Sequence, residues 1–201
     1  MSSPAVNEVI DISAAGPASV LFIDQQARFL AAHHRRVADL CTRIGNRMGM
    51  SDDRIYGLYL AASIHDIGKV HIPAGLLAKP GPLSGAEFGI IKAHVKLGYE
   101  MIKDIRWPWP VGEIILQHHE RLDGSGYPRG LHGDRMILES RIIAVADVVE
   151  AMSSYRAYRR ATPGTAAALH EIESRSGGLY DPAAAEACMR LFRDEGYKFP
   201  D

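Results

Sequence analysis

The sequence predicts an all-α fold, a helical bundle of about seven helices in one domain. Apolar residues recur at three- and four-residue spacings, as they do on the buried face of an amphipathic helix. No stretch alternates apolar and polar residues for long enough to indicate a β-strand. The chain has 201 residues, which is the length of a single globular domain.

The first helix is predicted over residues 20–48, and Gly49 ends it. One face of this stretch carries four apolar residues, namely Val37, Leu40, Cys41 and Ile44. Residues 1–25 are mostly small or polar and are interrupted by glycine and proline. We interpret them as a leader or linker remnant that is helical towards its end, and we expect the domain itself over residues 26–201.

Capping residues predict where the next helices begin. Ser51 is a plausible N-cap for the second helix. Glycine and proline exclude a long helix over residues 68–83. Ser84 and Glu87 then have the spacing of a capping box, which begins a helix that we expect to continue to Lys103.

The second half of the chain predicts four more helices and one long loop. The Trp-Pro-Trp-Pro segment at 107–110 separates the preceding helix from a short helix over 111–119. A glycine-rich loop follows over 123–134, and an almost wholly apolar central helix over 137–152. The last two helices are predicted to begin at cap-plus-proline pairs, Thr162-Pro163 and Asp181-Pro182.

Composition excludes several classes of function. The formal net charge is -1, whereas a surface that binds DNA or RNA needs clustered, uncompensated cations; a small phosphate ligand is still compatible. Cys41 and Cys188 lie far apart in apolar patterns, which indicates free thiols in a reducing compartment and a cytoplasmic protein. No apolar run is long enough for a membrane span, and no signal peptide is expected.

The chain has nine histidines, and several of them lie on or next to apolar helical faces. His65 and Asp66 end one predicted helix, and His94 lies on the apolar face of another. Asp147 lies inside the most apolar helix, where an unpaired carboxylate would cost several kcal/mol. This carboxylate needs a metal, a hydrogen-bond partner or a cation, for which Arg141 is a candidate.

Histidines and carboxylates from several helices can assemble a metal site in a bundle core. The donor set has nitrogen and oxygen but no sulfur, which suits iron, manganese, nickel or zinc and disfavours a structural zinc site. One carboxylate among several imidazoles can bridge two ions. Taken one by one, these histidines are also compatible with ordinary core or surface positions, as for the adjacent pair His118 and His119.

Five motifs together resemble the HD-GYP domain, a branch of the HD phosphohydrolase superfamily. They occur in this order: His65-Asp66-Ile67-Gly68-Lys69, His94 with Gly98, His118-His119-Glu120, Asp123-Gly124-Ser125-Gly126-Tyr127-Pro128, and Val145-Ala146-Asp147. The resemblance covers about residues 26–195. It implies a helical domain whose core holds two or three metal ions and which hydrolyses the bacterial messenger cyclic di-GMP by attack of a metal-bridging hydroxide on phosphorus.

The resemblance also implies roles for individual residues. The metal ligands would be His33, His65, Asp66, His94, His118, His119 and Asp147. Asp66 would bridge the ions, and Lys69 would meet a substrate phosphate, so these two are the expected catalytic residues. The other expected substrate contacts are Tyr127, Glu150, Arg156 and Arg159, although the two arginines are equally compatible with a solvated face. Glu120 and Asp123 are expected to fix the loop.

One departure from the family pattern bears on the number of metals. Members with a third ion carry a glutamate one helical turn before the first histidine ligand, and Phe29 occupies that position here. If His34 were the ligand in place of His33, the position would be Leu30, which is also apolar. We therefore expect two divalent ions, with iron or manganese favoured and nickel, cobalt or zinc compatible, and linear pGpG as the product.

Other functions fit part of the pattern. The chain could hydrolyse a related cyclic dinucleotide such as cyclic GMP-AMP, since no motif reads the base. It could also be a catalytically weak cyclic di-GMP sensor, or an adaptor that docks on diguanylate cyclases or other signalling proteins through its GYP loop. A general HD nucleotidase would not need that loop. The short leader fits a stand-alone protein and an excised catalytic fragment alike, and the oligomeric state is left open.

Overall fold

The computed structural model describes residues 17–154 and 162–200, and side chains in the first helix from residue 30 onward. Regular structure in these residues is helical, which confirms the predicted fold class. The α-helices are α1 (Pro17–Arg47), α2 (Asp52–Ile64), α3 (Ala74–Leu77), α4 (Gly85–Lys92), α5 (His94–Ile102), α6 (Val111–Gln117), α7 (Leu138–Ser153), α8 (Thr165–Ser174) and α9 (Pro182–Arg193). Two short 3-10 helices are η2 (Ile67–His71) and η3 (Gly133–Arg135).

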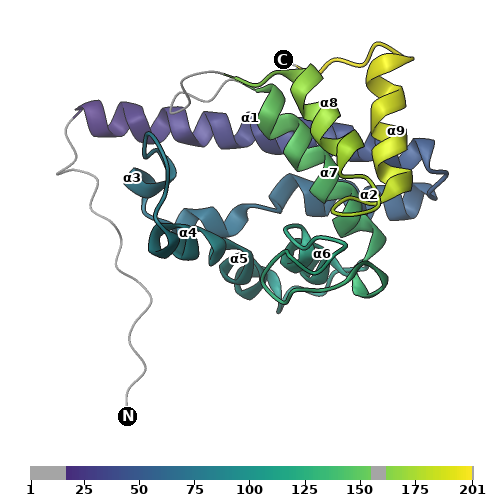
Figure 1. Ribbon diagram of the computed structural model, residues 1–201. Coiled ribbons are helices and arrows are strands. Elements are labelled where there is room, and N and C mark those ends of the chain that lie inside the picture. The colour runs from purple at the N-terminus through teal and green to yellow at the C-terminus, as the bar shows by residue number, and fades with distance from the viewer. Residues whose placement is uncertain (1–16, 155–161, 201) are drawn as a thin grey trace.

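The long helix α1 packs on α2, α7 and α9, and these contacts form the centre of the bundle. Figure 1 shows α1 across the top of the molecule, with α7, α8 and α9 on the right and α4, α5 and α6 below. The predicted apolar face of α1 is fully buried in this core, and so are both cysteines, which are free thiols. No helix in the described residues is long and apolar enough to cross a membrane.

Three of the predicted helix starts are confirmed. The Ser51 side chain accepts a hydrogen bond from the backbone of Arg54 at the start of α2. Ser84 and Glu87 form the predicted capping box at the start of α4. Asp181 caps α9 by accepting hydrogen bonds from the backbone N–H groups of Ala183 and Ala184. Each cap satisfies backbone donors that the first helical turn leaves without a partner.

Two predicted helix boundaries are wrong. The helix expected over 84–103 is divided into α4 and α5, because the N–H of Ala93 bonds to the carbonyl of Ile90 in a tight turn that redirects the chain. This break, together with the short α3, gives more helices than the seven expected. The pair Thr162-Pro163 does not begin α8. The chain instead turns at Gly164, whose φ of 88° is typical of glycine, and α8 starts one residue later.

A backbone contact between η2 and α5 brings two of the motifs together. A Cβ atom at Gly68 would overlap the carbonyl oxygen of His94 and would lie 2.5 Å from the amide nitrogen of Gly98. Only glycine therefore fits at position 68 without moving the two segments apart. The contact fixes Asp66, just before η2, against His94, the first residue of α5.

Candidate metal centre

Five regions of the fold bring their polar side chains to one point in the bundle. His33 comes from the middle of α1, and His65 and Asp66 follow directly after α2. His94 begins α5, His118 and His119 follow α6, and Asp147 comes from α7. His33, His65, Asp66, His94 and His118 are buried, and His119 is partly buried. All seven metal ligands that the resemblance implied therefore lie in one region.

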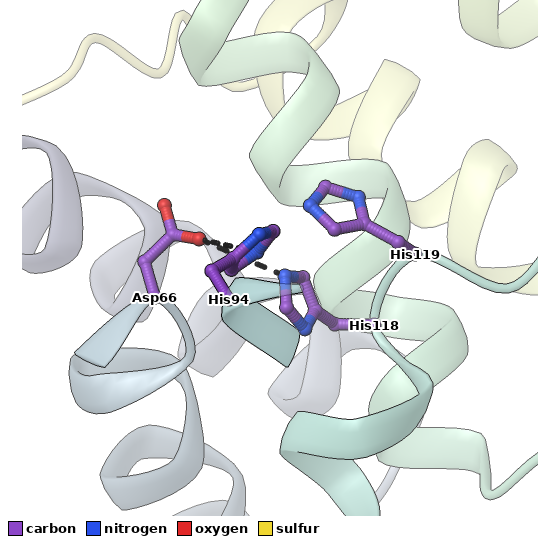
Figure 2. Close-up of side chains that lie close together, drawn as sticks. All are labelled: Asp66, His94, His118 and His119. Atoms are coloured by element: carbon purple, nitrogen blue, oxygen red, sulfur yellow. Dashed lines mark ion pairs between the residues drawn. The ribbon is translucent and has the colours of Figure 1, made fainter. Parts of the chain in front are cut away.

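Among the described residues, two groups have donor atoms close enough to hold a metal ion, and they share Asp66. The first, which we call the α5–α6 group, consists of Asp66, His94, His118 and His119, and Figure 2 shows these side chains converging. The Oδ1 atom of Asp66 lies 3.0 Å from Nε2 of His94 and 3.8 Å from Nε2 of His118.

The second, which we call the α1–α2 group, consists of His33, His65 and Asp66. Here the other carboxylate oxygen, Oδ2 of Asp66, lies 3.7 Å from Nε2 of His33 and 3.5 Å from Nε2 of His65. Asp147 borders this group, with its Oδ1 3.3 Å from Nε2 of His33 and 3.9 Å from Nε2 of His65. Asp66 thus presents one oxygen to each group, which is the geometry of a bridging carboxylate.

The histidine rings are oriented by hydrogen bonds at Nδ1. The Nδ1–H groups of His65, His94 and His118 donate to the backbone carbonyls of Ala62, Ile91 and Ile115, at 2.6–2.7 Å. His33 differs, because its Nδ1–H donates to a carboxylate, Oε2 of Glu150, at 2.5 Å. In every case the Nε2 atom is left to face the centre, as in metal-binding histidines whose other nitrogen is held by a second partner.

The buried Nε2 atoms provide a direct test of whether a metal fits. Within the described residues, Nε2 of His33, His65, His94 and His118 and Oδ1 of Asp66 are buried and make no hydrogen bond. Buried polar atoms without partners are costly, so a cluster of them indicates a missing partner. Divalent cations bind neutral imidazole nitrogen and carboxylate oxygen. These residues therefore fit divalent metal ions.

The pKa shift of His33 differs in direction from those of the neighbouring histidines. Burial and the neighbouring imidazole of His94 lower the pKa of His119 to about 3, and the pKa of His118 is also well below its usual value. Burial acts in the same direction on His33, but the carboxylates of Asp147, Asp66 and Glu150 outweigh it and raise the pKa of that ring. Burial likewise lowers the pKa of His65, so His118, His119 and His65 offer neutral imidazoles, whereas His33 is surrounded by carboxylates.

The structure corrects the suggested partner of Asp147. Arg141 does not pair with it; its Nη1 atom instead lies 2.6 Å from Oδ2 of Asp181, the N-cap of α9. The pKa of Asp147 is well below its usual value because His33 and His65 outweigh the effect of burial. Asp147 thus belongs to the histidine cluster, one of the alternatives that its sequence context left open.

The fold places Glu150 next to His33. Glu150 was assigned to the substrate, and its side chain is fully buried behind His33. Its Oε1 accepts a 2.6 Å hydrogen bond from Ser154 and lies 3.6 Å from Nη1 of Arg36. Arg36 in turn donates to the carbonyl of Pro200 near the C-terminus. The i,i+3 spacing of Asp147 and Glu150, which places both on one helix face, was the only sequence signal for this contact.

Lys69 and Tyr127, two of the residues expected to meet substrate, border the centre. The ammonium of Lys69 pairs with Oδ2 of Asp66. The ring of Tyr127 stacks on His119, with ring centroids 4.8 Å apart. Arg156 and Arg159 lie outside the described residues, and so does the side chain of Phe29.

Glu120 fixes the glycine-rich loop that carries Tyr127. It is fully buried, and its two carboxylate oxygens accept hydrogen bonds from the backbone N–H groups of Arg129 and Leu131, at 2.7 and 3.0 Å. Asp123 accepts from the backbone of Ser125 at 2.9 Å in a tight turn. Both residues therefore act on the loop, as the sequence suggested.

Known proteins resemble this chain over most of its length. A family model described as the HD domain matches residues 21–184. A cyclic di-GMP phosphodiesterase of Thermotoga maritima is 44% identical over 164 residues, which cover 81% of this chain and 44% of the relative. The cyclic di-GMP phosphodiesterase response regulator RpfG of Xanthomonas campestris is 39% identical over 80% of this chain and 43% of its own. The chain thus spans less than half the length of these relatives.

Solved structures share the fold at lower identity. An HDG"Y"P protein from Bdellovibrio bacteriovorus has a TM-score of 0.68 and 21% identity, covering 82% of this chain and 52% of the other. A cyclic GMP-AMP-specific phosphodiesterase from Vibrio cholerae has a TM-score of 0.61 and 20% identity, covering 81% of this chain and 44% of the other. At these identities the likeness extends to the fold alone.

Proposed function

The chain belongs to the HD domain family, and from this premise we propose that it is a metal-dependent phosphodiesterase that hydrolyses cyclic di-GMP to linear pGpG. We assign the activity to a catalytic domain over residues 26–201, an assignment supported by the family match over residues 21–184. The names of the two curated relatives above support the choice of cyclic di-GMP as substrate.

The observation that carries this proposal is the shared carboxylate of Asp66, with one oxygen in each of two histidine groups. Two divalent ions held there would polarise a phosphodiester and supply a nucleophile from water near neutral pH. A donor set of imidazole and carboxylate without sulfur suits iron or manganese, the metals we favour, and nickel, cobalt or zinc are compatible.

The protein's own side chains would bind and orient the substrate. Lys69 already lies against Asp66, and once the carboxylate holds metal its ammonium can donate to a non-bridging phosphate oxygen. Tyr127 stands beside His119 and can contact the ligand at the rim of the centre. Arg156 and Arg159 would add cations to the phosphate, as the family resemblance implies. Glu120 holds the loop in place through two backbone hydrogen bonds.

A second substrate is favoured by a specific relative. A 3'3'-cGAMP-specific phosphodiesterase of Vibrio cholerae is 41% identical to this chain over 137 residues, which cover 68% of this chain and 32% of the relative. Cyclic GMP-AMP is therefore the first alternative ligand. A sensor or an adaptor for diguanylate cyclases is the non-enzymatic alternative. The two buried free cysteines support a reducing compartment, and hence the cytoplasm, for any of these functions.

Turnover of cyclic di-GMP tests the proposal. Protein loaded with Mn²⁺ or Fe²⁺ without oxygen should convert cyclic di-GMP to pGpG, and metal analysis should return about two ions per chain. Cyclic GMP-AMP, assayed in parallel, distinguishes the substrates. Tight binding of cyclic di-GMP without any product would contradict the proposed enzymatic activity and favour a sensor. Three ions per chain would contradict the proposal of a two-metal centre.

A further inference from the structure

Beside the α5–α6 group lies a lysine to which no role has been given, Lys92 at the end of α4. Phe88 and Lys92 are four residues apart and so share one face of that helix. The Lys92 ammonium lies 4.7 Å from the ring centroid of Phe88 and 4.9 Å from that of Tyr127. The two rings meet edge to face at 6.3 Å.

Tyr127 connects this lysine to the metal centre. Its ring stacks on His119, which is a member of the α5–α6 group, at 4.8 Å. The Lys92 ammonium and the His119 imidazole therefore both contact the same aromatic ring. Phe88 is exposed and Lys92 and Tyr127 are partly exposed, so a ligand bound at the centre can reach all three.

The charge of Lys92 is not compensated by a carboxylate in the described part of the chain. Three other lysines pair with acidic side chains, namely Lys69 with Asp66, Lys79 with Glu87 and Lys103 with Glu100. Lys92 has only the faces of two aromatic rings as partners there. A cation–π contact is weaker than a charge-assisted hydrogen bond, so an anionic oxygen arriving from solvent would be the preferred partner.

We propose that Lys92 is a substrate-binding residue that contacts the second phosphate of the cyclic dinucleotide, the one that is not cleaved. This inference rests on the proposed function. A cyclic dinucleotide carries two phosphates on one ring, and only one of them can lie at the metal pair. The other lies about one nucleotide away, and Lys92, which shares the Tyr127 ring with His119, is the lysine next to the centre whose charge is uncompensated in the described residues.

The test compares two methionine variants. Lys92→Met keeps a stem that can pack on both rings but removes the charge, and Lys96→Met removes the same charge from an exposed position on α5. Lys92→Met should raise the KM for cyclic di-GMP about tenfold, the effect of losing one charge-assisted hydrogen bond, with kcat nearly unchanged. Lys92→Arg should restore most of the affinity, and Lys96→Met should leave KM unchanged.

Two further measurements separate substrate binding from a structural role. Metal content and the inhibition constant of inorganic phosphate, which needs only the metal pair, should be the same in Lys92→Met and wild type. The affinity for cyclic di-AMP, used as a competing ligand, should fall in Lys92→Met as much as the affinity for cyclic di-GMP. The two ligands share their phosphates and differ in their bases. Weakening of the guanine ligand alone would overturn the assignment to phosphate.

The failures of the two proposals are distinguishable. If the wild type hydrolyses cyclic di-GMP and Lys92→Met has the same KM, only the role of Lys92 is wrong. An equal rise in KM for Lys96→Met would also overturn it, because the effect would then be general to surface charge. If the wild-type protein neither binds nor cleaves the dinucleotide, the proposed function fails and the role of Lys92 fails with it.

Discussion

The α5–α6 group and the α1–α2 group share Asp66, but the protein holds them in different ways. In the α5–α6 group, His94 and His118 each donate to a backbone carbonyl three residues earlier. In the α1–α2 group, His33 donates to the carboxylate of Glu150, which is 117 residues away in the sequence. His65, the other histidine of the α1–α2 group, also donates to a carbonyl three residues earlier, so His33 alone is oriented by tertiary packing.

The two ways of orienting a histidine ring respond differently to mutation. A backbone carbonyl cannot be removed by a side-chain substitution, so the orientation of His94 and His118 is robust. His33 depends on a chain of side chains that runs from Glu150 through Ser154 and Arg36 to the carbonyl of Pro200. A mutation anywhere along that chain can alter the α1–α2 group while the other group stays intact.

The largest effect is expected at Asp66, the residue that the two groups share. Asp66→Asn removes the charge that both share, so both ions should be lost and turnover should fall by about 10³-fold or more. Metal analysis and product chromatography measure this. Asp134→Asn, a change at an exposed carboxylate in η3, should keep metal and activity. Retention of two ions by Asp66→Asn would show that Asp66 does not bridge them.

Single histidine variants should separate the groups. His118→Ala should remove the ion bound by the α5–α6 group, and His33→Ala should remove the ion bound by the α1–α2 group. Each variant should lower the metal content from about two ions to about one. Turnover should be lost in both variants, because the proposed chemistry needs both ions. Loss of both ions in either variant would mean that the groups bind metal as one cooperative unit. It would contradict the expectation that each group binds its own ion independently.

A graded series at Glu150 should affect the α1–α2 group alone. Glu150→Ala leaves Nδ1 of His33 without its partner and should weaken that metal site about 10- to 100-fold. Glu150→Gln should lie between the alanine variant and wild type, because an amide oxygen can accept the hydrogen bond but carries no charge. Metal titration measures both sites, and the α5–α6 group is the internal control. Equal weakening of both sites would contradict the separation.

The smallest effect is expected one step further along the chain of side chains. Ser154→Ala removes the hydroxyl that donates to Glu150 and should cost about 1 kcal/mol of unfolding free energy. Ser153→Ala is a matched control, since the Ser153 hydroxyl is buried and has no partner within the described residues. Denaturant unfolding of the two metal-free variants measures the difference. Equal unfolding free energies for the two variants would show that the Ser154 hydroxyl does not stabilise the fold through Glu150.

The sequence predicted what local rules determine. The capping residues gave the starts of three helices, and the motif around His65 and Asp66 identified the region of the metal centre. The partner of Arg141 depends on packing between helices and was missed. Arg141 and Asp147 are six residues apart, so they lie on different faces of α7, and Arg141 points instead to the start of α9.

The same reason explains why the contact of Glu150 with His33 and the start of α5 were not predicted. The burial of Glu150 depends on the packing of α1 against α7, and the i,i+3 spacing of Asp147 and Glu150 does not identify His33 as the partner. The break between α4 and α5 lies where α5 meets Gly68 of η2 at close range. Capping and periodicity describe one helix at a time, whereas these features arise where two helices meet.

The contact at Gly68 contains no side-chain torsion, because it joins the backbone of η2 directly to that of α5. The backbones that carry Asp66 and His94 are consequently held together without an intervening side chain. The separation of Asp66 and His33 passes through side chains that can change rotamer as temperature rises. We expect the metal-free centre to loosen on heating from the α1 side, so that the half formed by Asp66 and His94 is the last to lose its shape.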